Sequence, residues 1–134
     1  MDLKLEVLVL PVSDVDKSKA FYEQAGFNAD VDTQPNENFR IVQLTPPGSA
    51  CSIIIGKGLT TAAPGSAQGL TLVVSDIEAA RAYFIERGID ISDFFHFGPE
   101  GQEQGLDPER QDYGSFVSFT DPDENSWLVQ EKRG

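Results

Sequence analysis

The residue of this 134-residue chain that is best suited to proton transfer near neutral pH is its single histidine. His96 is the only histidine, in the run Phe94-Phe95-His96-Phe97. A histidine titrates near neutral pH, so His96 is a candidate for proton transfer or for a hydrogen bond to a ligand. The alternative is a partly exposed strand histidine without a functional role. No serine or cysteine lies in a recognisable nucleophile motif, so nucleophilic catalysis has no support.

Aromatic side chains are the second group of residues with evident binding chemistry. Aromatic rings stack on flat or conjugated ligands, although core strands are also rich in them. Strand alternation over residues 115–120 predicts Phe116 and Ser118 on one face of a sheet and Val117 and Phe119 on the other. Which face lines a binding site stays open at this point. The clustered aromatic residues are Phe39, Phe94, Phe95, Phe97, Tyr113, Phe116, Phe119 and Trp127.

An internal repeat organises the elements that must position these residues. Residues 12–27 (VSDVDKSKAFYEQAGF) align without a gap to residues 74–89 (VSDIEAARAYFIERGI) at a constant offset of 62. Such a repeat indicates duplication of one supersecondary unit. Each copy predicts a strand and then a helix, with Ser13 or Asp14 as the N-cap of the first helix and Ser75 or Asp76 as the N-cap of the second. Gly26 and Gly88 are expected to end the two helices in a left-handed conformation.

Each half of the chain is predicted to be a β-α-β-β-β unit. The first unit is expected over residues 1–56 and the second over 69–134, joined by a Gly-, Ala-, Ser- and Pro-rich linker at 57–68, all in one structural domain. Residues 98–114 show no periodicity and are predicted to be a mobile acidic loop or a lid. The predicted strands are residues 3–12, 27–31, 39–44, 51–55, 70–74, 89–97, 115–120 and 126–130.

Charge and composition narrow the class of partner. The formal net charge is −12, which argues against binding to nucleic acid or to an anionic membrane surface. The same charge weakly favours neutral or cationic small molecules. The single cysteine, Cys51, cannot form a disulfide within the chain, and no apolar stretch approaches the length of a membrane span. The N-terminal residues lack the apolar core of a signal peptide, so we expect a cytoplasmic protein.

Three segments together resemble the vicinal-oxygen-chelate superfamily, which includes glyoxalase I, extradiol dioxygenases, fosfomycin-resistance enzymes and bleomycin-resistance binding proteins. They are the two repeat copies and the terminal run DPDENSWLVQE at residues 121–131. The resemblance covers nearly the whole chain. It implies an α+β fold of two tandem β-α-β-β-β modules, whose curved mixed sheets form a cup-shaped cleft. It also implies a homodimer. The motifs are specific for the fold but not for one chemistry within it.

The resemblance also implies where metal ligands would lie. Metalloenzymes of the superfamily place His, Gln or Glu on the first and last strands of each module, and the matching positions hold Val7, Gly69 and Leu128. The remaining ligand belongs on residues 51–55, where only Cys51 and Ser52 are polar. Aliphatic side chains and glycine cannot coordinate a divalent cation, so the sequence predicts no metal and no cofactor.

A shift of one residue along the first strand of each module would replace Val7 by Glu6 and Gly69 by Gln68. The repeat links both registers, which argues against this shift. On the last strand, Leu128 and Gln130 are expected to face the cleft, with Trp127 and Val129 packed towards the helix.

The function predicted from the sequence is metal-independent binding or sequestration of a small aromatic or cationic molecule, such as an antibiotic or a metabolite. One alternative is a metal-free isomerase or lyase of secondary metabolism, in which His96 or a carboxylate in the cleft moves a proton. A third hypothesis is a metal-dependent glyoxalase or dioxygenase on the shifted register. Whether a reaction is catalysed, and by which residues, is left open. The candidate ligand-binding residues are Phe39, His96, Tyr113, Phe116 and Gln130.

Overall fold

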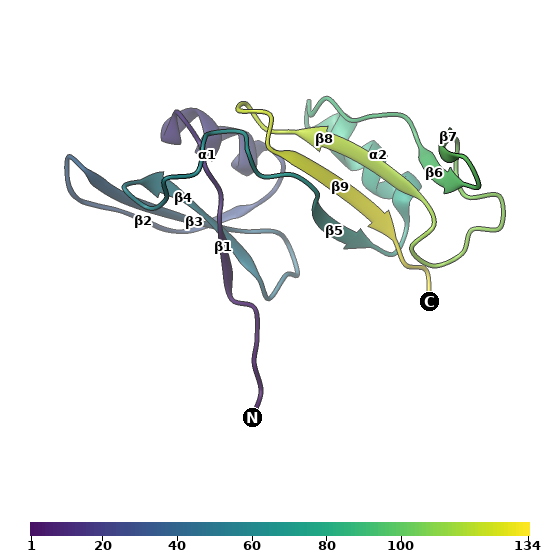
Figure 1. Cartoon of the computed structure of the whole chain (residues 1–134), viewed down its shortest axis with the longest axis horizontal. Helices are drawn as coiled ribbons and strands as arrows, with labels where there is room; N and C mark the ends of the chain where they lie inside the picture. Colours follow the sequence, from purple (N-terminus) through teal and green to yellow (C-terminus); the bar gives the residue numbers. More distant parts are fainter. The chain divides into compact units, whose positions relative to one another are not determined.

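The computed structural model describes residues 1–134 and has two mixed sheets and two helices, which confirms the predicted α+β fold (Figure 1). The chain forms two compact units, residues 1–67 with 121–125 and residues 68–120 with 126–134. The elements in chain order are β1 (Val7–Val9), α1 (Val15–Gln24), β2 (Asn28–Asn36), β3 (Phe39–Thr45), β4 (Ser52–Lys57), β5 (Leu70–Val74), α2 (Ile77–Glu86), β6 (Phe95–Gly98), β7 (Gly101–Gln104), β8 (Phe116–Thr120) and β9 (Ser126–Glu131).

The two units repeat one topology, as the duplicated sequence predicts. The first sheet has the strand order β1-β4-β3-β2, and the second has β5-β9-β8-β6 with β7 added at its edge. In each unit the first strand runs parallel to the last strand, and the other pairings are antiparallel. One helix packs on one face of each sheet, α1 on β3 and β4 and α2 on β8 and β9. Tandem β-α-β-β-β modules account for this pattern.

The helices begin and end where the sequence predicts. Asp14 caps α1 by accepting a hydrogen bond from the amide of Lys17, and Asp76 caps α2 by accepting from the amides of Glu78 and Ala79. Of the two cap candidates in each repeat, the structure selects the aspartate. Gly26 and Gly88 follow the helices with φ of 102° and 77°, where glycine is favoured. Neither ten-residue helix is long and apolar enough to cross a membrane.

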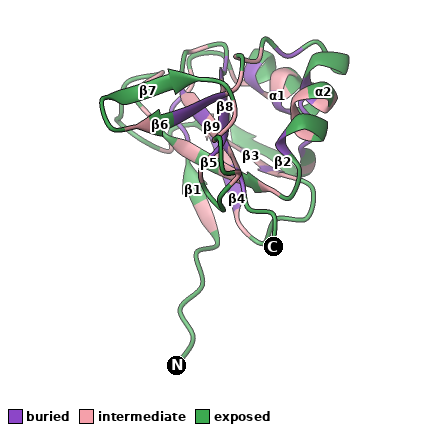
Figure 2. Ribbon diagram, turned by 90° about the vertical axis from the view of Figure 1, so that its right-hand side faces the viewer, coloured by how far each residue is buried: buried purple, intermediate pink, exposed green.

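The cores lie between each helix and its sheet, and the outward sides of both helices are exposed (Figure 2). In the first unit the buried residues include Tyr22 of α1 and the β3 residues Val42 and Leu44. In the second unit Phe119 stacks on Trp127 with ring centroids 5.8 Å apart, and Phe84 of α2 contacts Phe119 at 5.3 Å. Packing on the helix side therefore uses the large side chains of β8 and β9.

The turn at residues 121–125 belongs to the first unit, although it joins β8 to β9. The buried carboxylate of Asp121 accepts hydrogen bonds from Tyr22 Oη (2.8 Å) and from the Asn125 side-chain amide (2.8 Å). It also accepts bonds from the backbone amides of Asp123 and Asn125, both at 2.9 Å. The Asn125 side chain donates in turn to Pro11 O (2.9 Å). The DPD motif is thus a buried hydrogen-bond centre of the first unit.

Three sequence predictions need correction. The strand predicted over residues 89–97 begins only at Phe95, because β6 covers Phe95–Gly98 and residues 89–94 belong to no strand. The first strand is shorter than residues 3–12, because β1 covers only Val7–Val9 and residues 1–6 are exposed. Residues 98–114 are not one structureless loop, since β7 pairs with β6 as a hairpin and the following residues carry many hydrogen bonds. All four residues of β7 are polar or glycine and exposed, so no alternation marked them as a strand.

Candidate functional site

Strand pairing assigns the side chains of the second sheet to two faces. Phe116 pairs with Gln130 and Ser118 pairs with Leu128, and directly paired residues share a face. Trp127 lies on the other face, against α2. The prediction that Trp127 of the last strand packs towards the helix is therefore confirmed. We call the opposite side the helix-free face of the second sheet; it consists of Thr71, Val73, Phe95, Phe97, Phe116, Ser118, Leu128 and Gln130.

Three phenylalanine rings form a cluster on this helix-free face. Phe95 and Phe116 are cross-strand partners, and their rings stack with centroids 5.5 Å apart and an interplanar angle of 14°. Phe97 meets both rings edge-on, at 5.9 Å from Phe95 and 5.3 Å from Phe116. Phe97 is 59% exposed, whereas Phe95 and Phe116 are buried. The cluster therefore presents one supported aromatic ring to solvent, which is suited to stacking on a flat molecule.

Gln130 and Tyr113 border the aromatic cluster. Gln130 Nε2 donates a hydrogen bond to Tyr113 O (3.1 Å), and the Tyr113 amide donates to Glu131 O (2.6 Å). Tyr113 has φ of 66°, a left-handed conformation that is uncommon for a tyrosine. Its side chain is about half exposed. Three of the five predicted site residues, Tyr113, Phe116 and Gln130, are thus brought together at one end of β8 and β9.

A buried ion pair holds the segment that carries Tyr113. Arg110 donates from Nε to Glu131 Oε1 (2.9 Å) and from Nη2 to Glu131 Oε2 (2.8 Å), and Glu131 is fully buried. Glu131 Oε2 also accepts from the amide of Ile77, the first residue of α2 (3.0 Å). The hydrogen bonds from Arg110 hold the pKa of the Glu131 carboxyl below its usual value, and Glu131 raises the pKa of Arg110. Sequence reasoning missed this pair, because the two residues are far apart in the chain.

His96 lies on the other face of its strand. The alternation of β6 places Phe95 and Phe97 on the helix-free face, so the ring of His96 points away from it. His96 is buried, with Nδ1 2.8 Å from Gly105 O and Nε2 3.1 Å from Glu103 Oε2. These contacts fasten β6 to β7 and to the residue after β7. The structure does not bring His96 to the same surface as Phe116 and Gln130.

Phe39, the fifth predicted residue, belongs to the first unit. Phe39 is the first residue of β3 and is half-buried. Its ring lies close to Gly58, since a Cβ atom added to Gly58 would be 3.5 Å from Phe39 Cδ2. The first sheet also has a face opposite its helix, which we call the helix-free face of the first sheet. By strand pairing it consists of Val7, Val9, Val31, Thr33, Phe39, Ile41, Gln43, Thr45, Ser52 and Ile54.

A chain of polar side chains interrupts the apolar residues of that face. Gln43 Nε2 donates to Ser52 Oγ (3.4 Å), and Ser52 Oγ lies 2.6 Å from Thr45 Oγ1. Thr45 Oγ1 donates to Asp30 Oδ2, and Asn28 Nδ2 donates to Asp30 Oδ1. These two bonds lower the pKa of the Asp30 carboxyl. Sequence reasoning missed this cluster, because a shift of register between Ala29 and Val31 breaks the alternation that would have placed Asp30.

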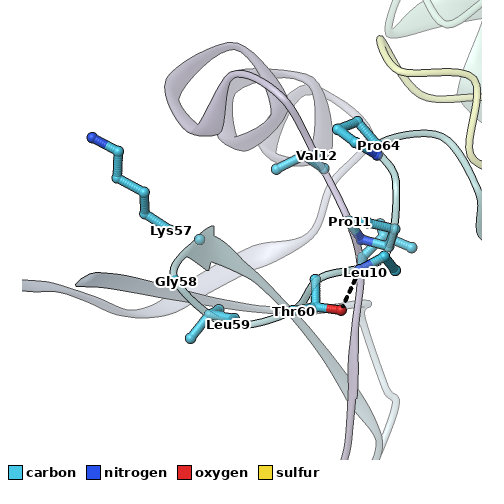
Figure 3. Close-up of a pocket in the computed structure, with 10 residues that line it drawn as sticks. Leu10, Pro11, Val12, Lys57, Gly58, Leu59, Thr60 and Pro64 are labelled. Atoms are coloured by element: carbon cyan, nitrogen blue, oxygen red, sulfur yellow. Dashed lines mark hydrogen bonds between the residues drawn. The ribbon is translucent and has the colours of Figure 1, made fainter. Parts of the chain in front are cut away.

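The first unit also contains a pocket of about 230 Å³ where β1 and β4 end (Figure 3). Its walls come from the end of β1, from residues 11–12 and from the segment that follows β4. Lys57 lies at its margin, and its ammonium donates to Glu37 O (3.0 Å) rather than into the pocket. None of the five predicted site residues lines it. The lining residues are Leu10, Pro11, Val12, Gly56, Lys57, Gly58, Leu59, Thr60, Ala62 and Pro64.

Comparison with known protein families matches residues 4–129 to the Glyoxalase/Bleomycin resistance protein/Dioxygenase superfamily. The chain belongs to this superfamily. The resemblance deduced from the repeat copies and the DPD motif is thereby confirmed at the level of the superfamily. No curated protein sequence matches the chain.

Several solved structures are similar to this chain along nearly its whole length. TnmS3, an antibiotic binding protein from Streptomyces sp. CB03234, is 31% identical with a TM-score of 0.74, covering 98% of this chain and 97% of its own. A glyoxalase/bleomycin resistance protein from the same organism is 32% identical with a TM-score of 0.71, covering 96% of this chain and 100% of its own. A superfamily member from Sphaerobacter thermophilus DSM 20745, 24% identical with a TM-score of 0.71 over 98% of each chain, shows the shared fold.

The positions that hold a metal ion in superfamily metalloenzymes do not fit a cation here. Val7 pairs with Ser52, which places Val7 rather than Glu6 on the helix-free face of the first sheet. Leu128 lies on the helix-free face of the second sheet and pairs with Thr71, and Ile54 pairs with Val9. Because Val9 and Thr71 are equivalent at the repeat offset of 62, Ile54 holds the place on β4 that matches Leu128. The side chains of Val7, Ile54 and Leu128 offer no lone pair to a cation. No group of three or more His, Cys, Asp or Glu residues in the chain is arranged to hold a metal ion.

Proposed function

We propose that this protein binds a flat, aromatic or cationic small molecule without a metal ion and thereby sequesters it. The observation that carries the proposal is the exposed ring of Phe97, held edge-on by the stacked pair Phe95 and Phe116 on the helix-free face of the second sheet. A preformed aromatic surface binds a conjugated ligand with little loss of side-chain entropy. Gln130 beside it offers an amide for orientation.

The likeness to TnmS3 supports an antibiotic as the ligand class. TnmS3 is an antibiotic binding protein, and the similarity extends over nearly the full length of both chains. The net charge of −12 favours a neutral or cationic molecule over an anionic one. Because Val7, Ile54 and Leu128 lack donor atoms, we propose that binding rests on stacking, apolar burial and hydrogen bonds alone.

The predicted ligand-binding residues have separate roles in this proposal. Phe116, Gln130 and Tyr113 form the binding surface of the second unit together with Phe97, whereas Phe39 lies on the first sheet and is not part of that surface. His96 lies behind that surface, and we propose that it holds the β6–β7 hairpin, which carries Phe97. A metal-free isomerase would need a proton-transfer group at the ligand. Both ring nitrogens of His96 are already hydrogen-bonded away from the surface, so we favour binding over catalysis.

A ligand screen with a surface variant tests the proposal. We expect bleomycin or another member of a panel of antibiotics and aromatic metabolites to raise the melting temperature, equally with and without EDTA. Phe97→Ala should weaken affinity for that compound by about tenfold, since one stacked ring contributes on the order of 1 kcal/mol beyond its buried area. Ile85→Ala, which removes an exposed apolar side chain from α2, is the matched control and should leave affinity unchanged. A panel without any stabilising compound would overturn the proposal, and loss of binding in EDTA would overturn metal independence.

We also propose that the protein is a cytoplasmic homodimer. Support for the dimer comes from exposed apolar residues on the edge strands β1 and β5, including Leu8, Val9 and Val73. Exposed apolar edges of this kind favour association with another chain. The unpaired Cys51 agrees with a reducing compartment. Sedimentation velocity at micromolar protein should give the mass of two chains, and Val73→Lys should shift it towards one. A wild-type protein that sediments as a single chain contradicts the dimer.

A further inference from the structure

The polar chain on the helix-free face of the first sheet has an unusual setting. Val7, Val9 and Ile54 surround it with apolar surface, yet Gln43, Ser52 and Thr45 lie among them on adjacent positions of β3 and β4. Ser52 is almost fully buried, and its hydroxyl is bonded on both sides. Buried hydroxyls in such a network have a defined direction of donation, because each carries only one proton.

Because each hydroxyl carries one proton, the donor of every hydrogen bond in the polar chain can be assigned. An ionised carboxylate only accepts, so Thr45 must use its single proton on Asp30. The contact between Ser52 and Thr45 then requires Ser52 to donate to Thr45 Oγ1. With its proton used, Ser52 can only accept from Gln43, so the nitrogen of the Gln43 amide must face Ser52. Donation therefore runs from Gln43 through Ser52 and Thr45 to the carboxylate of Asp30.

The direction of donation determines which atom of the Gln43 side-chain amide remains available to a ligand. Its Nε2 is committed to Ser52, so its carbonyl oxygen Oε1 is left on the helix-free face as an acceptor, beside one remaining N–H. The side-chain amide of Gln43 is polarised because it donates into a series of hydrogen bonds that ends at the Asp30 carboxylate. This polarisation makes the amide carbonyl a stronger hydrogen-bond acceptor. Gln43 is half-buried and paired with Ile54, so its carbonyl is partly screened from water.

We infer that Gln43 is a recognition residue whose carbonyl accepts a hydrogen bond from the protonated amine of an aromatic ligand. The inference rests on the proposed function only for the kind of ligand, an aromatic molecule. It concerns a separate surface on the helix-free face of the first sheet and adds the substrate class, a cationic aromatic amine. Asp30, three hydrogen bonds away, supplies the negative charge that favours a cation at this position. The apolar residues around Gln43 accommodate the ring system that carries the amine.

The polar chain can be tested without any ligand. In ¹H–¹⁵N spectra recorded from neutral to acid pH, the side-chain amide signals of Gln43 should follow the titration of Asp30, with a midpoint below that of an ordinary aspartate. Asp30→Asn and Thr45→Val should each abolish this response while the backbone spectrum stays folded. Gln43 signals that titrate equally in Thr45→Val would show that the chain does not reach Gln43, and would overturn the inference.

Two related dyes test the ligand class. 9-Aminoacridine is a cationic aromatic amine at neutral pH, and acridine is its neutral analogue without the amino group. We expect wild-type protein to bind 9-aminoacridine about tenfold more tightly than acridine, which is the effect of one hydrogen bond to a charged group. Gln43→Leu keeps the net charge and should remove most of that preference, with acridine binding unchanged. Gln34→Leu, at an exposed position on β2, should keep the preference.

The outcomes separate the two proposals. Equal affinity for the two dyes in the wild type, or a preference that survives Gln43→Leu, would overturn the recognition role of Gln43 and leave the proposed binding function standing. Binding of neither dye, with no compound of the larger panel stabilising the protein, would overturn the binding function and the recognition role together.

Discussion

Replacing Glu131 by glutamine is expected to lower the free energy of unfolding by about 3 kcal/mol, because a buried charge pair loses one partner. In the wild type the carboxylate accepts two bonds from Arg110 and one from the amide of Ile77. The amide of glutamine has one acceptor oxygen, and its NH₂ group would face donors. Urea denaturation followed by the fluorescence of Trp127 measures the difference.

A double variant distinguishes loss of the pair from loss of packing. In Arg110→Met/Glu131→Leu both charges of the pair are removed, so neither is left buried alone; only the Ile77 amide loses its acceptor and the exposed Glu78 loses its contact with Arg110. We expect this variant to be clearly more stable than Glu131→Gln, because apolar replacements of buried ion pairs are often close to neutral. If it is equally destabilised, the segment around Tyr113 depends on shape rather than on the ion pair. A Glu131→Gln protein as stable as the wild type would contradict the prediction itself.

The pH dependence of the same pair has a definite sign. Arg110 lowers the pKa of Glu131 in the folded state relative to the ordinary glutamate value in the unfolded chain. The stabilisation is therefore complete above the unfolded pKa and is lost as pH falls through the lower, folded pKa. The stability difference between wild type and Glu131→Gln should be constant at neutral pH and shrink in acid. A difference that grows on acidification would contradict this assignment.

Replacing Asp121 by asparagine is expected to destabilise the protein by about 3 kcal/mol, because its carboxylate accepts four hydrogen bonds inside the first unit. An asparagine turns one acceptor into a donor that would face the Tyr22 hydroxyl and the Asn125 amide. Tyr22→Phe removes only one donor and should cost about 1 kcal/mol, so it reports on the cluster even if Asp121→Asn fails to fold.

Asp123→Asn is the matched control for Asp121, two residues along the same turn. Asp123 accepts from the amide of Ser13 at 3.0 Å and from its hydroxyl at 2.5 Å, near the surface. Its replacement should cost less than about 1 kcal/mol. Thermal or urea unfolding that ranks Asp123→Asn as equally damaging would contradict a special role for Asp121 in the buried centre.

Local patterns in the sequence predicted much of the fold. The repeat of 62 residues predicted two units of the same topology, and Asp14, Asp76, Gly26 and Gly88 marked the helix ends. The resemblance placed Leu128 at a ligand position that faces the cleft, alternation then predicted that Trp127 packs on the helix side, and the stack on Phe119 confirms it. Caps and alternation depend on residues within a few positions of each other, so the sequence displays them directly.

Contacts between distant segments were not predictable in this way. β7 has no apolar residue, so only its pairing with β6 reveals it as a strand. The pairing of Phe95 with Phe116 places Phe95 on the helix-free face, and the alternation of β6 then turns His96 away from the surface that holds Phe116. A shift of register in β2 brings Asp30 to Thr45, and no period in the sequence indicates such a shift.

By itself, the sequence determined the duplicated α+β architecture, the superfamily and the aliphatic residues at the positions where metalloenzymes carry ligands. Only the tertiary structure decided which polar groups meet: Arg110 with Glu131, Asp121 with Tyr22, and Asp30 with Thr45. The physical reason is that strand and helix periods arise from the local backbone, whereas these pairs form where sheet pairing and loop closure bring together parts of the chain that share no local pattern.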